Sequence, residues 1–338
     1  MNFFFAFSYE LELSFYLFSL RTQQLYMQQI KVGISACLLG DEVRFDGGHK
    51  RSAFCTDELG RHVEFVKLCP EVGIGMSVPR PTIRLEQRQH GARAVVPKTG
   101  EDVTERLVQF AERATPHLQQ ISGYVLCAKS PSCGMERVKL YNPDNGHARK
   151  EGIGIFAAQL QQRYPALPLE EDGRLNDPML RENFVMRVFV YAAWQGLSKP
   201  LKKADLLAFH TSLKLLLLAH NQQLYRDLGR KVAEQQELTE AFTTEYIESV
   251  MTALAEPATR ANHTNVLQHI QGYFKSLLNS DQRAELTEAI LAYREGLEPL
   301  LVPLTLLRHY LREFPNDYLH GQRYLNPYPK DMKLRYGL

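Results

Sequence analysis

Apolar and polar positions follow different patterns in the two halves of the chain. In the first half, short apolar runs at residues 31–36, 63–68 and 121–126 predict buried strands, and residues 101–118 carry apolar side chains at helical spacing. Another helix is predicted at 154–164. Strands that alternate with helices in this way are typical of an α/β domain with a mostly parallel sheet.

In the second half the pattern changes to long amphipathic helices. One helix face is predicted from side chains that recur every three or four positions, namely Leu206, His210, Leu213, Leu217, His220 and Leu224. Further helices are expected at 262–278, 280–297 and 304–314, the last after a break at Pro299 and Pro303. The second domain is therefore predicted to be all-α.

The two patterns meet at a stretch rich in glycine, serine and proline, so we expect domains at residues 27–196 and 197–338. Residues 1–26 fall outside both. Glu10 and Glu12 interrupt their apolar run, no basic start precedes it, and no small-residue cleavage site follows it. This argues against a signal peptide or a membrane span. We interpret the segment as an upstream extension from a misassigned start codon, with an interfacial membrane anchor as the alternative.

The composition favours an intracellular enzyme with a core of ordinary size. The chain has 338 residues, of which 44% are hydrophobic and 23% charged, and its net charge is +2. So small a charge does not by itself indicate a nucleic-acid partner. The five cysteines are too sparse and irregular for a disulfide-stapled secreted fold, and the expected location is a reducing cytoplasm.

Three cysteines stand where a predicted strand gives way to a turn. Cys37 and Cys69 each follow an apolar run directly, and Cys133 lies just past a third one. The carboxyl ends of parallel strands open onto one edge of a sheet, so we expect these thiols to converge there. Three thiolates leave one position of a metal centre open, as a catalytic site requires. The other two, Cys55 and Cys127, are interpreted as small buried hydrophobic residues.

Turn-forming and ionisable residues surround these cysteines. A glycine turn follows the first, a carboxylate stands two residues after the second, and two hydroxyls and an ammonium bracket the third; these residues are Asp46, Gly47, Gly48, Glu71, Lys129, Ser130 and Ser132. Proline and glycine beside a thiolate shape the backbone so that amide N–H groups point at sulfur. Gly152 and Gly154 form a lone G-x-G, which is too weak a motif to predict a dinucleotide site.

Five short motifs together carry a family resemblance. They are Ser35-Ala36-Cys37-Leu38-Leu39-Gly40, Arg44-Phe45-Asp46-Gly47-Gly48, Cys69-Pro70-Glu71, Pro79-Arg80 and Ser130-Pro131-Ser132-Cys133-Gly134. Over roughly residues 30–195 the chain resembles the thiouracil desulfidase (TudS-like) family. The remainder is similar to the YbgA-like C-terminal domain in features such as Asn262-His263, Gly272-Tyr273-Phe274-Lys275 and Pro303-Leu304-Thr305. The combination resembles RudS-type proteins, which convert 4-thiouridine in tRNA to uridine.

The resemblance implies a [4Fe-4S] cluster held by Cys37, Cys69 and Cys133, with a fourth iron that has no protein ligand and binds the substrate sulfur. It further implies non-redox, hydrolytic cleavage of the C–S bond with release of sulfide. Glu71 is then expected to activate water or relay its proton, and Ser130 to donate to the pyrimidine. Substrate contacts are expected from Asp46, Gly47, Gly48, Arg80, Lys129 and Ser132.

The expected partner is tRNA, with free thiolated bases also possible and neither a membrane nor an obligate protein partner inferred. Basic residues follow the Pro79-Arg80 motif and recur among aromatic residues near the end of the chain, which favours phosphate and stacking contacts; the main ones are Arg84, Arg88, His90, Arg93, Arg308, Arg323 and Arg335. Two alternatives stay open, a small-molecule thiouracil desulfidase and a non-catalytic metal-binding RNA module. The large helical domain favours the tRNA enzyme over the first, and Glu71 and Ser130 favour an enzyme over the second.

Overall fold

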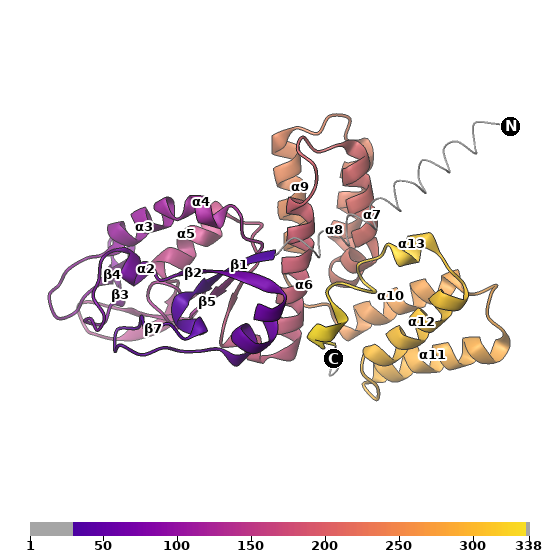
Figure 1. Cartoon of the computed structure of the whole chain (residues 1–338), viewed down its shortest axis with the longest axis horizontal. Helices are drawn as coiled ribbons and strands as arrows, with labels where there is room; N and C mark the ends of the chain where they lie inside the picture. Colours follow the sequence, from indigo (N-terminus) through magenta and orange to yellow (C-terminus); the bar gives the residue numbers. More distant parts are fainter. Residues whose placement is uncertain (1–29, 336–338) are drawn as a thin grey trace. The chain divides into compact units, whose positions relative to one another are not determined.

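The computed structural model describes residues 30–335, so the interpretation of residues 1–26 lies outside the described residues (Figure 1). The chain divides into two compact units, one of residues 29–177 and one that begins at Pro178. The first unit combines strands and helices, and among the described residues the second contains helices and no strand. The predicted combination of an α/β domain and an all-α domain is confirmed.

The first unit is built on a parallel sheet with the strand order β2-β1-β5-β8. Its strands are β1 (Ile30–Ser35), β2 (Val63–Leu68), β5 (Tyr124–Leu126) and β8 (Leu169–Glu171), each parallel to its neighbours. Apolar side chains of β1 and β5 are fully buried and form the core. A Cβ atom at Gly33 would lie 2.2 Å from the ring of Tyr124, so this strand pairing requires glycine there.

A second sheet, which the apolar pattern did not predict, has the order β4-β3-β6-β7. Its strands are β3 (Arg84–Arg88), β4 (Gly91–Val95), β6 (Val138–Tyr141) and β7 (Ala148–Gly152). Two antiparallel hairpins, β3–β4 and β6–β7, join through the parallel pair β3–β6. In β7 only Gly152 is buried, so no apolar alternation marks this strand.

The helices of the first unit pack against one another and against strands of both sheets, α3 against β4 and α5 against β5 (Figure 1). They are α2 (Pro70–Gly73), α3 (Thr104–Arg113), α4 (Thr115–Leu118) and α5 (Ile155–Arg163). The rings of Phe110 in α3 and Phe156 in α5 lie 5.8 Å apart, and Phe156 also packs 5.8 Å from the ring of Tyr124. The helices predicted at 101–118 and 154–164 are thus present, the first divided at Ala114 before Pro116.

The second unit consists of helices joined by short connections. They are α6 (Pro178–Gln195), α7 (Lys203–His220), α8 (Gln222–Glu234), α9 (Glu240–Ala253), α10 (Arg260–Tyr273), α11 (Ser280–Glu295), α12 (Leu301–Glu313) and α13 (Asp317–His320). Among residues 30–335 no helix combines the length and apolar character needed to cross a bilayer.

Two details differ from the sequence-based expectation. Helix α6 was expected in the first domain, but it groups with the helical unit, where Asn183 donates to the Leu254 carbonyl and Trp194 packs 5.4 Å from Phe209. Pro303 was expected to break the helix before residue 304, yet it lies inside the first turn of α12. Proline is tolerated there because the first N–H groups of a helix have no intrahelical acceptor.

Candidate active site

Three cysteines from three different loops line one cavity at the carboxyl edge of the parallel sheet. Cys37 lies in a short turn of 3-10 helix (Ala36–Leu39) after β1, Cys69 directly follows β2, and Cys133 lies in the loop after β5. The cavity has a volume of about 550 Å³. This confirms the predicted convergence of the three thiols, and their role as ligands stays a prediction.

A fourth thiol, which was not predicted from the sequence, lines the same cavity. Cys127 directly follows β5, and its backbone N–H donates to Ser35 Oγ at 3.0 Å. The thiols of Cys127 and Cys37 shift each other's pKa, upward for Cys37 and downward for Cys127. Cys55, in contrast, is fully buried and does not line the cavity. The strand-end position that pointed to the other three thiols applies equally to Cys127 and was the available signal.

Burial in the cavity wall disfavours ionised thiols. Burial raises the pKa of Cys133 well above its ordinary value and is the largest cause of the raised pKa of Cys69. The hydrogen bond with Cys127, followed by burial, raises the pKa of Cys37. Two backbone N–H groups of α2 point at the Cys69 sulfur and act in the opposite direction. Several buried thiols ionise together only when a positive centre compensates them, as a soft metal centre does.

The hydroxyl of Tyr124 lies buried near these thiols with no hydrogen-bond partner among residues 30–335. Burial raises its pKa well above the ordinary value, and the thiols of Cys133, Cys69 and Cys37 add to that effect. An unsatisfied buried donor is costly, by about 1–3 kcal/mol, and calls for an explanation such as an absent ligand. A sulfur-rich group in the cavity would supply an acceptor, so the thiols and this hydroxyl together fit an iron–sulfur cluster.

Within the described part of the chain, no three or more histidine, cysteine or acidic side chains are arranged to hold a single metal ion.

The carboxylate of Glu71 is held by two buried partners. Ser132 Oγ donates to Glu71 Oε1 at 2.7 Å, and the guanidinium of Arg80 lies 2.7 Å from Oε2. Arg80 also donates to the Val43 carbonyl at 2.8 Å, and its side chain is only 3% exposed. Glu71 itself lines the cavity. Together the two partners fix the orientation of the carboxylate.

The loop that carries Cys133 is held by the Ser130 hydroxyl and by the start of α5. Ser130 Oγ accepts hydrogen bonds from the N–H groups of Ser132 and Cys133 at 3.2 and 3.1 Å. Gly154 N–H donates to the Gly134 carbonyl at 2.8 Å, and a Cβ at Gly154 would lie 2.6 Å from the Ser132 backbone. A hydroxyl has one hydrogen and two lone pairs, so Ser130 retains its hydrogen for donation to a ligand in the cavity.

A glycine turn places Asp46 in the cavity wall. Gly47 adopts a φ of 80°, in the left-handed region that favours glycine, and Gly48 N–H donates to Asp46 Oδ1 at 3.1 Å. Phe45 beside it is 39% exposed and also lines the cavity, with the guanidinium of Arg44 5.6 Å from its ring centroid. Phe45 was not predicted from the sequence.

An ion pair brings a positive charge to the thiols. Lys50 Nζ lies 2.8 Å from Asp172 Oδ2, and Asp172 accepts a hydrogen bond from the Ala128 N–H at 2.8 Å. Burial opposes the charge of Lys50, but its contacts with Asp172 and the nearby thiols outweigh burial and raise its pKa. The hydrogen bond from Cys37 and the charge of Lys50 in turn lower the pKa of Cys127.

The predicted substrate contacts divide into two groups. Asp46, Arg80 and Lys129 line the cavity, Lys129 with a left-handed φ of 65°. Gly47, Gly48 and Ser132 do not line it. The two glycines shape the turn that carries Asp46, while Ser132 is fully buried and binds Glu71. The guanidinium of Arg80 is likewise engaged with Glu71, so Arg80 and Ser132 are placed to orient that carboxylate.

Most of the basic residues expected to contact phosphates are engaged within the protein. Arg84 and Arg88 both pair with the buried carboxylate of Glu86, because alternate residues of a strand share one face. In the helical unit Arg323 and Arg335 are buried, and the Arg308 guanidinium donates to the Leu325 carbonyl. Arg93 pairs with Asp102 and Glu105. The expected phosphate-binding role of this set is therefore not supported by its placement.

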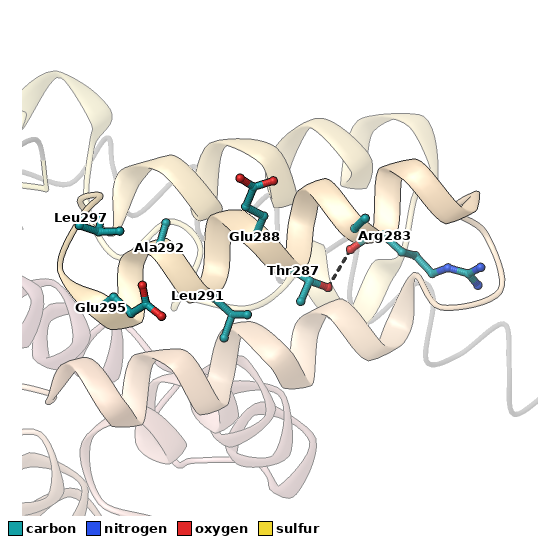
Figure 2. A pocket seen from close by; sticks show the side chains of 8 residues that line it. Arg283, Thr287, Glu288, Leu291, Ala292, Glu295 and Leu297 are labelled. Carbon is teal, nitrogen blue, oxygen red and sulfur yellow. Dashed lines mark hydrogen bonds between the residues drawn. The ribbon is translucent and has the colours of Figure 1, made fainter.

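A second hollow, of about 590 Å³, lies along α11 in the helical unit (Figure 2). Its wall combines Leu291 and Leu297 with the carboxylates of Glu288 and Glu295. Figure 2 shows these side chains along α11, with Leu297 in the turn that follows the helix, and the lining contains no cysteine or histidine. The thiol-lined cavity is therefore the candidate active site.

Fold and site define a class of protein in which a parallel α/β domain carries a thiol-lined cavity and precedes a helical domain. Residues 32–172 match the family model of 2-thiouracil desulfurase, and residues 214–329 match that of a protein family of unknown function, DUF1722. The chain thus belongs to the thiouracil desulfidase family through its TudS-like N-terminal domain, fused to a YbgA-like C-terminal domain.

Individual proteins match one part of the chain each. Uncharacterized protein YbgA of Escherichia coli is 40% identical over 139 residues, which cover 40% of this chain and 82% of that protein. Uncharacterized protein YbbK of Bacillus subtilis is 32% identical over 136 residues, 38% of this chain and 88% of that protein. The solved structure of a [4Fe-4S]-dependent thiouracil desulfidase, TudS, is 32% identical, covers 44% of this chain and 95% of its own, and superposes with a TM-score of 0.36.

Proposed function

We propose that this protein is an iron–sulfur-dependent desulfidase that converts 4-thiouridine in tRNA to uridine and releases sulfide. The observation that carries the proposal is the convergence of three cysteines and Glu71 on one cavity. The net reaction replaces C=S by C=O, with water supplying the oxygen and both hydrogens of the departing H₂S. No oxidant or reductant is consumed.

Cys37, Cys69 and Cys133 would hold the cluster, since all three line the cavity and come from separate loops. A bound [4Fe-4S] cluster with one iron outside the protein's ligand set would supply a Lewis acid for the soft sulfur of the substrate. The hydroxyl of Tyr124 does not line the cavity, but it is buried near the thiols and would donate to a sulfur atom there.

Glu71 is the residue that would manage the proton of the attacking water. Its carboxylate lines the cavity, and the contacts from Arg80 and Ser132 hold it in one orientation. An ionised carboxylate in a fixed orientation accepts a proton from water as general base and returns it to the leaving sulfur as general acid. Arg80 and Ser132 act here as positioning residues.

The pyrimidine would be oriented by the polar rim of the cavity. The Ser130 hydroxyl retains a hydrogen for a carbonyl oxygen of the base, and Lys129 stands beside it. The exposed ring of Phe45 offers a stacking surface, and the Arg44 guanidinium above it suits a neighbouring phosphate. A nucleotide inside folded tRNA would have to leave its stack to reach this cavity.

A small-molecule thiouracil desulfidase is the second candidate function, because the cavity wall alone contains all the groups that the reaction requires. The YbgA-like domain favours the tRNA substrate, since a free base needs no extended docking surface. A non-catalytic metal-binding RNA module is disfavoured by the buried contacts that fix Glu71, because a binding module has no need of a positioned carboxylate.

Anaerobic purification, iron and sulfide assays and nucleoside analysis of treated tRNA test the proposal. The protein is expected to carry about four irons and four sulfides per chain. Replacing Cys37, Cys69 or Cys133 by alanine is expected to remove both cluster and activity, whereas the Cys55→Ala control retains both. Stoichiometric zinc without labile sulfide would contradict the proposal, and turnover of free 4-thiouracil without any loss of 4-thiouridine from tRNA would favour the second candidate.

A further inference from the structure

Cys37 and Cys127 lie just past the carboxyl ends of two neighbouring strands. Strands β1 and β5 pair in parallel, with Gly33 opposite Tyr124 and Ile34 opposite Val125. This register, continued past the ends of both strands, brings the segment after β1 beside the segment after β5. The 3.0 Å hydrogen bond from Cys127 N–H to Ser35 Oγ ties the two segments together, and both thiols line the same cavity.

The surroundings distinguish this pair from the other thiols. Both sulfurs line the cavity, so a small oxidant in the cavity reaches them, whereas Cys55 is fully buried elsewhere. Lys50 carries its ammonium group close to Cys127 and is fixed there by Asp172.

We propose that Cys37 and Cys127 form an intramolecular disulfide whenever the cavity holds no cluster, and that this bond controls loading of the centre. Both S–H bonds break and one S–S bond forms. The two electrons and two protons pass to a peroxide, whose O–O bond breaks to give two water molecules when the oxidant is hydrogen peroxide.

The consequence for the centre is direct. Only the role of Cys37 as a ligand rests on the proposed function; the disulfide itself does not. Once Cys37 is bonded to Cys127 it has no thiolate to offer, and two cysteines are left of the proposed ligand set. Reduction by a dithiol restores both thiols. Cys127 thus protects Cys37 from irreversible oxidation to sulfinic acid when the cluster is lost.

Peptide mapping of the metal-free, fully reduced full-length protein tests the pairing. Trypsin places each of the five cysteines in a different peptide, because a cleavage site separates every consecutive pair. After treatment with the thiol oxidant diamide and alkylation, the expected product joins the peptides of residues 32–44 and 114–129. Cys55, Cys69 and Cys133 are expected as alkylated monomers. A link from Cys37 to Cys69 or Cys133, or alkylated Cys37 and Cys127, would overturn the proposal.

Iron uptake gives the second measurement. The diamide-treated wild-type protein is expected to bind roughly tenfold less iron on anaerobic reconstitution, and dithiothreitol is expected to restore binding. Cys127→Ala and Cys127→Ser are expected to load iron equally with and without diamide, while the matched Cys55→Ala variant behaves like the wild type. Equal inhibition of the Cys127 variants and the wild type would refute the control of loading. Failure of any form to bind iron, with the predicted cross-link present, would count against the cluster and not against the disulfide.

Discussion

The hydroxyl of Ser132 donates a 2.7 Å hydrogen bond to Glu71 Oε1, although the two residues are 61 positions apart in the chain. Ser132 is fully buried, and on the other side of the carboxylate the buried Arg80 guanidinium contacts Oε2. The bond connects the loop that carries Cys133 to the helix that follows Cys69. One carboxylate therefore links two of the proposed ligand loops and faces the cavity between them.

Glu71→Gln is expected to lower turnover by a factor of about 10² or more while iron and sulfide content stay unchanged, because the amide keeps hydrogen bonds to Ser132 and Arg80 but accepts no proton. The measurement is single-turnover loss of thiolated base at equal iron content. Glu64→Gln, on the exposed side of β2, is the matched control. Rates near those of the wild type in the loaded Glu71 variant would make Glu71 a structural residue.

Tyr124→Phe is expected to have opposite effects on the metal-free and loaded proteins. Removing a buried hydroxyl with no partner in the described structure should raise the free energy of unfolding of the metal-free protein by about 1 kcal/mol, as judged by urea denaturation. The loaded variant should lose iron faster, because the cluster loses a donor. Tyr328→Phe is the contrast, since its hydroxyl donates to Glu182 and its removal should destabilise. Unchanged stability and iron retention would show that the Tyr124 hydroxyl neither destabilises the metal-free protein nor donates to the cluster.

The strand-end rule explains why the position of the site was predictable. Parallel strands share one carboxyl edge, so sequence alone brings Cys37, Cys69 and Cys133 together. The same rule applies to Cys127, which was interpreted from the sequence as a small buried hydrophobic residue. The rule does not give the order of the strands in the sheet. Cys127 lies beside Cys37 because β5 pairs with β1.

The exposure of charged residues was predicted less well, for two different reasons. The pairing of Arg84 and Arg88 with Glu86 could have been predicted from the sequence, because alternate residues share a face once the segment is assigned as a strand. The burial of Arg323 could not have been predicted in this way, because its backbone N–H donates to the Ser212 carbonyl, 111 positions earlier in the chain. Long-range packing of this kind leaves no local pattern.

His210 predicts an acid-sensitive helical unit. Burial is the main cause that lowers the pKa of His210 from 6.5 to about 4, and its Nδ1 lies 3.1 Å from the Tyr246 hydroxyl. Between these two values the unfolded chain binds the proton and the folded chain does not, so stability falls as the pH drops from 6.5 toward 4. The difference of about 2.5 pH units corresponds to roughly 3 kcal/mol.

His210→Gln should remove this part of the pH dependence, as measured by urea unfolding at pH 7 and at pH 4.5. A remaining slope is expected from His220 and His263, because burial lowers the pKa of both. His320 is exposed, so the control variant His320→Asn should keep the wild-type slope. An identical pH dependence in the His210 variant and the wild type would contradict the prediction.

The rim of the cavity should contribute to binding of tRNA through charge. Arg44 and Lys129 line the cavity beside the exposed ring of Phe45, and Arg44 makes a long ion pair of 3.7 Å with Asp46. Arg84 and Arg88, in contrast, both contact the buried carboxylate of Glu86. Each phosphate contact adds about 0.7 to 0.9 to the slope of log affinity against log salt, so replacing both Arg44 and Lys129 by alanine should flatten that slope by about 1.5. Fluorescence anisotropy with labelled tRNA over a salt series measures the slope.

The matched control replaces Arg106 and Arg163, which pair with Glu101 and Glu112 and do not line the cavity. It removes the same charge and should leave the slope unchanged. Hydrolysis of free 4-thiouracil, which has no phosphate, should depend little on salt in the wild type and in both double variants. An unaltered slope after loss of Arg44 and Lys129 would place the phosphate contacts elsewhere on the protein, and an equal change in both double variants would reduce the effect to net charge.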